Sequence, residues 1–441
     1  MRIRDSLGVV LSGADAPALA HYENALQQFR CYCGDPLASL EAALGVRPAF
    51  VMAHVFKAYL YLLGTEPAGL AVARHCHAAA LTLPANTHER GHLAVLGQLL
   101  EGHWARAGQS LEDLSIEQPR DILALQVGHQ VDFFCGNSRM LRDRIARALP
   151  VWHESMPGYH ALLGMHAFGL EETAQYGAAE AAGRRAVELE PRDGWAQHAV
   201  AHVLEMQCRT HEGIAWMRAT PQAWATDSFF QVHNWWHLAL YHLELGEIDQ
   251  VLALYDGPID GTGSTVLLEL IDASALLWRL QLQGTTLGTR WQRVAERWEP
   301  LASAGNYAFN DVHAMMAFVG AGRPQAALEL LDAQQRAMVR GDDNARFTAE
   351  VGRPLCLAML AFGAGDYAQC IRLLRPLRAI TQRFGGSHAQ RDLFDLTLIE
   401  AALRAGQRAL ATALCNERLS LRSTSPLSRQ LVGRAELQWA A

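Results

Sequence analysis

Three side chains capable of acid–base or metal chemistry recur at helical spacing near the middle of the chain. His198, His202 and Glu205 occupy positions i, i+4 and i+7 of a helix predicted over 195–206. At about 100° per residue these positions lie on one narrow stripe of the helix. The residues between them are mainly alanine, valine and leucine. Three polar groups on an otherwise apolar helix favour a functional site.

Two kinds of chemistry fit this stripe. Imidazole and carboxylate are ligands for divalent metals, so His198, His202 and Glu205 would supply three ligands and leave one position open. The pattern is not the H-E-x-x-H motif of zinc proteases, because Ala199 stands where that motif needs its general base. Without a metal, a glutamate beside a histidine in a partly desolvated groove can serve as a general acid and base pair.

The elements that must hold the stripe are predicted to be helix pairs. Pro157 and Pro191 bracket a unit of 34 residues, which is the tetratricopeptide period. Short turns that contain glycine recur at 245–248, 321–324, 364–367 and 405–408, and an amphipathic segment follows each one. Alternation with period two is nearly absent. We therefore predict an all-α fold, a right-handed α-solenoid of tetratricopeptide-type antiparallel helix pairs.

The predicted domain organisation is a single repeat domain over residues 1–441. The composition of 50% apolar and 19% charged residues is that of a chain that folds throughout. The segment 256–265, rich in glycine, aspartate and threonine, is the best candidate for an irregular crossing. It would divide the domain into halves 1–255 and 266–441.

Several repeats would point functional groups into one groove. Alignment of helix 195–206 on the tetratricopeptide consensus places the stripe at positions that face the inner groove of such repeats. The same alignment places Glu171 of the preceding repeat and His233 of the following one at groove positions. The predicted catalytic residues are His198, His202, Glu205, Glu171 and His233.

Later helices would complete the site with groups that bind a ligand. Helix N-termini suit anions, and Arg391 adds a charge-matched fork for a carboxylate or phosphate. The structural alternatives are packing for the tryptophans and helix capping for Asp311 and Asp392. The predicted ligand-binding residues are Trp236, which should face the groove, His237, Asn310, Asp311, His313, His388, Arg391 and Asp392.

Charge and cysteine content restrict partners and location. The net charge of −7 opposes binding to polyphosphate, so we expect neither a nucleic acid nor an anionic membrane as partner. No stretch of roughly 18 uninterrupted apolar residues appears. The eight cysteines include one C-x-C and no paired C-x-x-C motifs, and we expect reduced thiols in a cytoplasmic protein.

The chain resembles the tetratricopeptide repeat protein 38 family, also described as StaR-like. The segments that carry the resemblance are 169–172, 198–205, 232–240, 255–256, 309–316 and 386–392. Their histidines are not demanded by helix packing. The resemblance implies a helical repeat over nearly the whole chain. About chemistry it implies little: an oxidative role is suggested for one relative, and the residues here favour acid–base chemistry more.

The function predicted from these features is a tetratricopeptide-repeat protein whose His/Glu-lined inner pocket binds a small molecule. If it is an enzyme, hydrolysis or related acid–base chemistry is expected, with a divalent metal as the one cofactor considered. The alternative is a non-catalytic scaffold whose concave groove binds a peptide or partner protein. Such grooves commonly use Lys, Arg and Asn, whereas this one offers mainly His, Glu and Trp.

Overall fold

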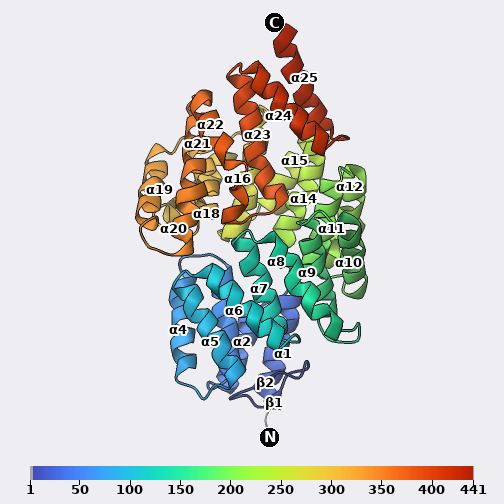
Figure 1. Cartoon of the computed structure of the whole chain (residues 1–441), viewed down its shortest axis with the longest axis vertical. Helices are drawn as coiled ribbons and strands as arrows, with labels where there is room; N and C mark the ends of the chain where they lie inside the picture. The colour runs from blue at the N-terminus through green and yellow to red at the C-terminus, as the bar shows by residue number, and fades with distance from the viewer. Residues whose placement is uncertain (1–2, 441) are drawn as a thin grey trace. The chain divides into compact units, whose positions relative to one another are not determined.

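A computed structural model describes residues 3–440 of the chain, with side chains up to Leu437 (Figure 1). It forms two compact units. The first contains the residues up to Val200 together with 220–231, and the second contains 201–219 with 232–440. Helix α11 (Gly194–Met206) contributes residues to both. The segment 256–265 lies inside the second unit, and the division into halves 1–255 and 266–441 stays a prediction.

The first unit is built from helices and one small hairpin. Strands β1 (Ile3–Arg4) and β2 (Val10–Leu11) pair antiparallel, a minimal sheet that the sequence did not indicate. The helices are α1 (Ala16–Cys31), α2 (Pro36–Val46), α3 (Val51–Leu63), α4 (Gly69–Leu81), α5 (Thr87–Leu100), α6 (Trp104–Glu117), α7 (Ile122–Phe134), α8 (Ser138–Ala148), α9 (Tyr159–Glu171), α10 (Tyr176–Leu189) and α13 (Pro221–Ala225), with a 3-10 turn at Leu149–Val151.

The second unit is helical throughout its described residues. Its helices are α12 (Thr210–Ala219), α14 (Gln231–Glu244), α15 (Ile248–Leu254), α16 (Leu267–Leu282), α17 (Arg290–Trp298), α18 (Ala308–Ala321), α19 (Pro324–Ala337), α20 (Asp343–Phe347), α21 (Arg353–Gly363), α22 (Tyr367–Leu374), α23 (His388–Arg404), α24 (Arg408–Leu421) and α25 (Pro426–Ala440). Short 3-10 or π turns occupy Tyr255–Ile259, Glu299–Leu301, Thr348–Gly352, Arg375–Leu377 and Thr381–Phe384.

Consecutive helices pack as pairs, and the pairs pack on one another. In the first unit α1 packs on α2, α3 on α4, α5 on α6 and α9 on α10, while α8 joins the last pair through α9. In the second unit α21 packs on α22 and α23 on α24, and α16 contacts both α18 and α23. The prediction of an all-α fold made of antiparallel tetratricopeptide-type helix pairs is confirmed.

The turns between paired helices fall where the glycines predicted them. Gly246, Gly322, Gly365 and Gly406 all have φ between +64° and +77°. This left-handed backbone region is strained for residues with a Cβ atom, so glycine ends the first helix of a pair at low cost.

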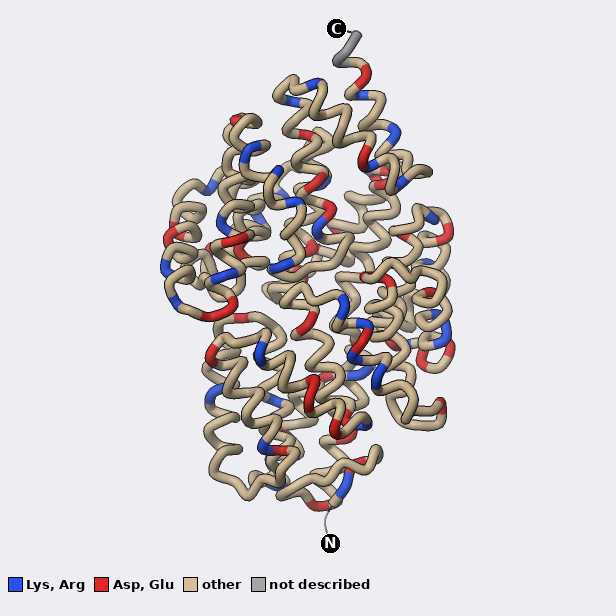
Figure 2. Tube along the Cα trace, in the orientation of Figure 1, with Lys and Arg blue, Asp and Glu red and all other residues tan. Residues whose placement is uncertain are grey.

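Charges are distributed without a dominant block. Figure 2 shows acidic and basic residues interspersed along both units. Within the described residues, no helix combines the length and the apolar content needed to cross a lipid bilayer.

Close helix packing depends on residues without bulk, as Gly169 of α9 illustrates. A Cβ atom at Gly169 would lie 2.4 Å from the backbone nitrogen of Arg142 and 2.5 Å from the carbonyl carbon of Leu141. Backbone cannot yield as a side chain does, so helix α8 would have to move away from α9.

We expect Gly169→Ala to lower the free energy of unfolding by about 3 kcal/mol, because the added methyl group overpacks the contact between α8 and α9. Chemical denaturation followed by circular dichroism measures this. Gly177→Ala in α10 is the matched control, since a Cβ atom added at Gly177 would have no neighbouring atom within 4 Å. The control should be neutral or stabilising by up to about 1 kcal/mol. Equal destabilisation of both variants would contradict the packing argument.

Candidate functional site

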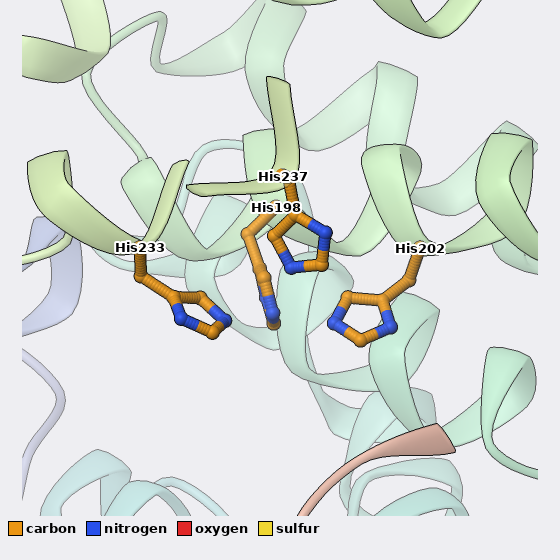
Figure 3. Close-up of side chains that lie close together, drawn as sticks. All are labelled: His198, His202, His233 and His237. Atoms are coloured by element: carbon orange, nitrogen blue, oxygen red, sulfur yellow. The ribbon is translucent and has the colours of Figure 1, made fainter. Parts of the chain in front are cut away.

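Three histidines meet inside the second unit and are called here the three-histidine cluster: His202, His233 and His237 (Figure 3). His202 lies on α11, and His233 and His237 lie one turn apart on α14. The ring centroids of His202 and His237 are 4.5 Å apart, and those of His233 and His237 are 4.9 Å apart. Each ring offers a nitrogen within 4.8 Å of a nitrogen of the other two. Helical spacing on α14 and the packing of α11 beside it therefore bring three potential ligands to one point.

Two carboxylates contact the rings of the cluster. Oδ2 of Asp272, on α16, lies 2.9 Å from Nδ1 of His233. Oε2 of Glu205, on α11, lies 3.4 Å from Nδ1 of His237. The Asp272 carboxylate accepts from Nδ1 of His233, which orients that ring and leaves its Nε2 to act as a ligand or base.

Burial favours the uncharged form of His202 and His237. Desolvation lowers the pKa of His202 well below its ordinary value, and the neighbouring imidazole of His237 lowers it further. Desolvation likewise lowers the pKa of His237, with His233 and Arg279 acting in the same direction. Both rings are neutral near pH 7, so each has a nitrogen lone pair available for a Lewis acid or a proton.

Trp236 supports the cluster from within α14. Its fully buried indole stacks on the ring of His233 at 5.3 Å and meets the ring of His237 edge-on at 5.0 Å. The tryptophan thereby restricts the orientation of both histidines. Its predicted part in ligand binding stays a prediction.

Two residues predicted for the same groove belong to the first unit. His198 lies one helical turn before His202 on α11, and Glu171 is the buried last residue of α9. The His198 ring lies 5.2–5.3 Å from the rings of Phe168, Trp195 and Phe230. Within its own unit His198 therefore belongs to an aromatic cluster. The catalytic roles expected of Glu171 and His198 stay predictions.

Beside the three-histidine cluster, Glu205 also lines a pocket of the second unit together with Arg279, Asp392, Arg418 and Arg422. The pocket is small, with a cavity volume of about 30 Å³. Nε of Arg279 and Nε of Arg418 have no hydrogen-bond partner among the described residues. These donors suit a carboxylate or another small oxoanion.

Asp392 joins the arginines of this pocket. Its carboxylate accepts from Nη2 of Arg418 at 3.1 Å and lies 3.4 Å from Nη1 of Arg279. Burial alone would raise the pKa of Asp392, but Arg418, Arg422 and Arg279 together hold it well below its usual range. Asp392 is thus a fixed counter-charge. Helix α23 is capped by Ser387, so the capping interpretation of Asp392 is wrong.

The predicted residues of α18 have different surroundings. Asp311 accepts a hydrogen bond from Gln334 of α19 at 3.3 Å, and burial raises its pKa to about 7. Tyr307 occupies the N-cap position of α18, so Asp311 does not cap that helix. Nδ1 of His313 lies 2.8 Å from the carbonyl oxygen of Phe309. Asn310, between them, is buried.

His388 and Arg391 lie in the first turn of α23. Nη2 of Arg391 is 3.4 Å from Nδ1 of His388, and the same guanidinium donates to the carbonyl of Gly386. The role in ligand binding expected of His388 and Arg391 stays a prediction.

Sequence reasoning missed four charged residues of this site. Asp272 and Arg279 are seven residues apart on α16, a helix otherwise buried along almost its whole length. Two charges on one stripe of a buried apolar helix were a usable signal. Arg418 of α24 and Arg422, which follows that helix as its C-cap, gave none, because arginines four residues apart at the end of an amphipathic helix look like a solvated face.

His313 provides a test of how burial controls the histidines of this unit. Burial lowers its pKa to about 4, and Arg279 contributes in the same direction. The unfolded chain binds the proton near pH 6.5, so this residue makes the free energy of unfolding fall as the pH drops from about 6.5 towards 4. Between pH 7.5 and 5.0 the loss should be about 2 kcal/mol, and His313→Gln should remove it. Urea titrations at the two pH values measure the difference. The same loss in both proteins would contradict the assignment.

Comparisons with known proteins bear on the fold. No known protein-family model matches the chain. Among solved structures it is similar to the human IFIT1 dimer with m7Gppp-AAAA, at 16% identity and a TM-score of 0.37 over 97% of this chain and 96% of that one. It is also similar to yeast Tom70, at 13% identity and a TM-score of 0.34 over 96% of each chain. At these TM-scores the two likenesses add no argument, and the helical fold is described from the chain's own helix pairs.

Proposed function

We propose that the second unit binds a divalent transition-metal ion through the three-histidine cluster and acts on a small anionic molecule held in the adjoining pocket. The observation that carries the proposal is the convergence of three imidazole nitrogens within 4.8 Å of one another. Hydrolysis is the reaction we favour. We also propose membership of the tetratricopeptide repeat protein 38 family, a cytoplasmic location and no nucleic-acid or membrane partner.

The residues fit a metal ion of the zinc class. Tetrahedral coordination with bonds of about 2.1 Å needs ligand nitrogens about 3.4 Å apart, so the rings would move closer by at most about 1.4 Å. Burial favours the neutral forms of His202 and His237, so a metal ion would not have to displace a proton from either ring. The contact between His233 and Asp272 is the carboxylate–histidine arrangement that commonly supports metal ligands.

The proposed ligands differ from those first predicted. The stripe on helix 195–206 suggested His198, His202 and Glu205. We keep His202 and replace the other two by His233 and His237, because all three then belong to one compact unit. Glu205 lies 3.4 Å from His237, one of the proposed metal ligands, and is better suited to act as a base than as a ligand itself.

The chemistry of such a site follows from its parts. A metal ion held by three histidines supplies a Lewis acid with an open coordination position. Glu205 lies between the cluster and the pocket, where its carboxylate can accept a proton from a water that attacks the bound molecule. Arg279 and Arg418 orient the anion through their Nε donors.

The first test is a titration of the chelator-treated protein with Co²⁺, followed by the visible absorption bands that a tetrahedral nitrogen site gives this ion. We expect one equivalent to bind to the parent protein, and His237→Ala to abolish the bands. Asp272→Asn should weaken binding by about 10- to 100-fold, because the carboxylate supports a ligand without being one. His211→Ala is the matched control, since His211 is an exposed histidine of the same unit.

The alternative function is the peptide-binding scaffold. Failure of the parent protein to bind Co²⁺, or binding that His237→Ala leaves unchanged, would contradict the metal centre and favour that alternative. Circular dichroism of each variant separates loss of the site from loss of the fold.

A further inference from the structure

A pair of cysteines lies at the end of α1 in the first unit, apart from the three-histidine cluster. Cys31 is the last residue of α1 and is fully buried, whereas Cys33 is partly exposed. The two thiols are one residue apart in the chain, and each affects the acidity of the other. This is the C-x-C motif of the sequence, and the proposed metal chemistry does not use it.

A histidine and an aspartate extend the pair. Nε2 of His160 lies 4.0 Å from Sγ of Cys31, and Nδ1 of His160 lies 2.7 Å from Oδ2 of Asp193. The other oxygen of Asp193 accepts the backbone N–H of Ala196 at 2.9 Å, which fixes the carboxylate at the start of α11. Cys31, His160 and Asp193 therefore form a line of contacts in space: a thiol, a base and a group that orients the base, as in nucleophile-activating triads.

The two sulfur atoms differ in acidity. The side chain of Cys31 lowers the pKa of Cys33 to about 7 against the effect of partial burial, and Arg192 acts in the same direction. The side chain of Cys33 raises the pKa of Cys31, and burial raises it further. The accessible sulfur is therefore the nucleophile, and the buried sulfur keeps its proton.

The backbone holds the two sulfurs in place. The N–H of Cys33 donates to the carbonyl of Gln28 at 3.0 Å, and the N–H of Phe229 donates to the carbonyl of Tyr32 at 2.7 Å. Tyr32 has φ 54°, a conformation that residues with side chains seldom adopt and that persists only where the surroundings impose it. The segment is thus anchored on both sides of Tyr32.

We propose that Cys33 and Cys31 form a thiol–disulfide exchange site that reacts with a low-molecular-weight disulfide, RSSR, of the glutathione disulfide type. The thiolate of Cys33 attacks one sulfur of RSSR, the S–S bond breaks, and RS⁻ leaves. Cys31 gives its proton to Nε2 of His160 and attacks the sulfur of Cys33, and the second RS⁻ leaves with the proton from His160. The two cysteines lose two electrons, and RSSR is reduced to one thiol and one thiolate.

The test uses the full chain with glutathione disulfide as the probe. Trypsin releases residues 31–57 as a peptide that contains both cysteines and no other, so its mass reports their state directly. In the parent protein we expect an internal disulfide. Cys31→Ser should accumulate a stable mixed disulfide on Cys33, and Cys33→Ser should leave Cys31 unmodified because it is buried.

Alkylation supplies a second measurement. At pH 7 Cys33 should react with iodoacetamide about threefold faster than free cysteine, because its larger thiolate fraction outweighs its lower intrinsic nucleophilicity. Its rate should rise with a midpoint near pH 7. Cys135, the internal control for oxidation, is also partly exposed and lies in the same unit.

His160→Asn separates positioning from packing. The amide keeps a polar contact to Asp193 but cannot take the proton of Cys31, so the mixed disulfide should persist longer while the alkylation rate of Cys33 stays unchanged. Two outcomes would overturn the proposal: no internal disulfide at any concentration of glutathione disulfide, or oxidation of Cys135 as fast as that of Cys33.

Discussion

The desolvation of polar side chains inside packed helix pairs is the constraint on which both candidate sites depend. A helical repeat hides its inner faces, so a histidine or carboxylate on such a face loses water and must gain a partner or become neutral. His202 and His237 respond by remaining uncharged. Asp392 responds by remaining charged beside three arginines. The same burial thus produces neutral ligands at one point and a fixed ion network at the next.

Neutral imidazoles and buried arginines are complementary in chemistry. In our proposal the cluster binds a cation and the arginines bind a small anion. Asp272 and Asp193 repeat one device in two places, since each holds Nδ1 of a histidine and thereby directs its Nε2. In the second unit the ring directed in this way is a metal ligand in our proposal, and in the first unit it is a base for a thiol.

The sequence was informative where local pattern determines structure. Glycine turns and amphipathic spacing predicted the helix pairs, because backbone conformation and burial of an apolar stripe are local requirements. The repeat alignment placed His233 at a groove position, and His237 was predicted separately as a ligand-binding residue. Contacts between separate helices could not be predicted in this way. Asp272 reaches His233 across 39 residues and His160 reaches Cys31 across 129, distances in sequence at which no periodicity carries information. The capping interpretation of Asp311 and Asp392 was wrong because Tyr307 and Ser387 occupy the N-cap positions of their helices.

Glu205 belongs to two neighbourhoods at once. One of its oxygens lies 3.4 Å from His237, and the residue also lines the pocket that contains Arg279 and Arg418. The charge of one carboxylate acts on both sides. Its interaction with a cation at the cluster therefore depends on whether an anion occupies the pocket beside the guanidinium groups. If both proposed ligands bind, occupancy of the cluster and occupancy of the pocket are therefore thermodynamically linked through this residue. By reciprocity, whatever factor a cation applies to the affinity for the anion, the anion applies to the affinity for the cation.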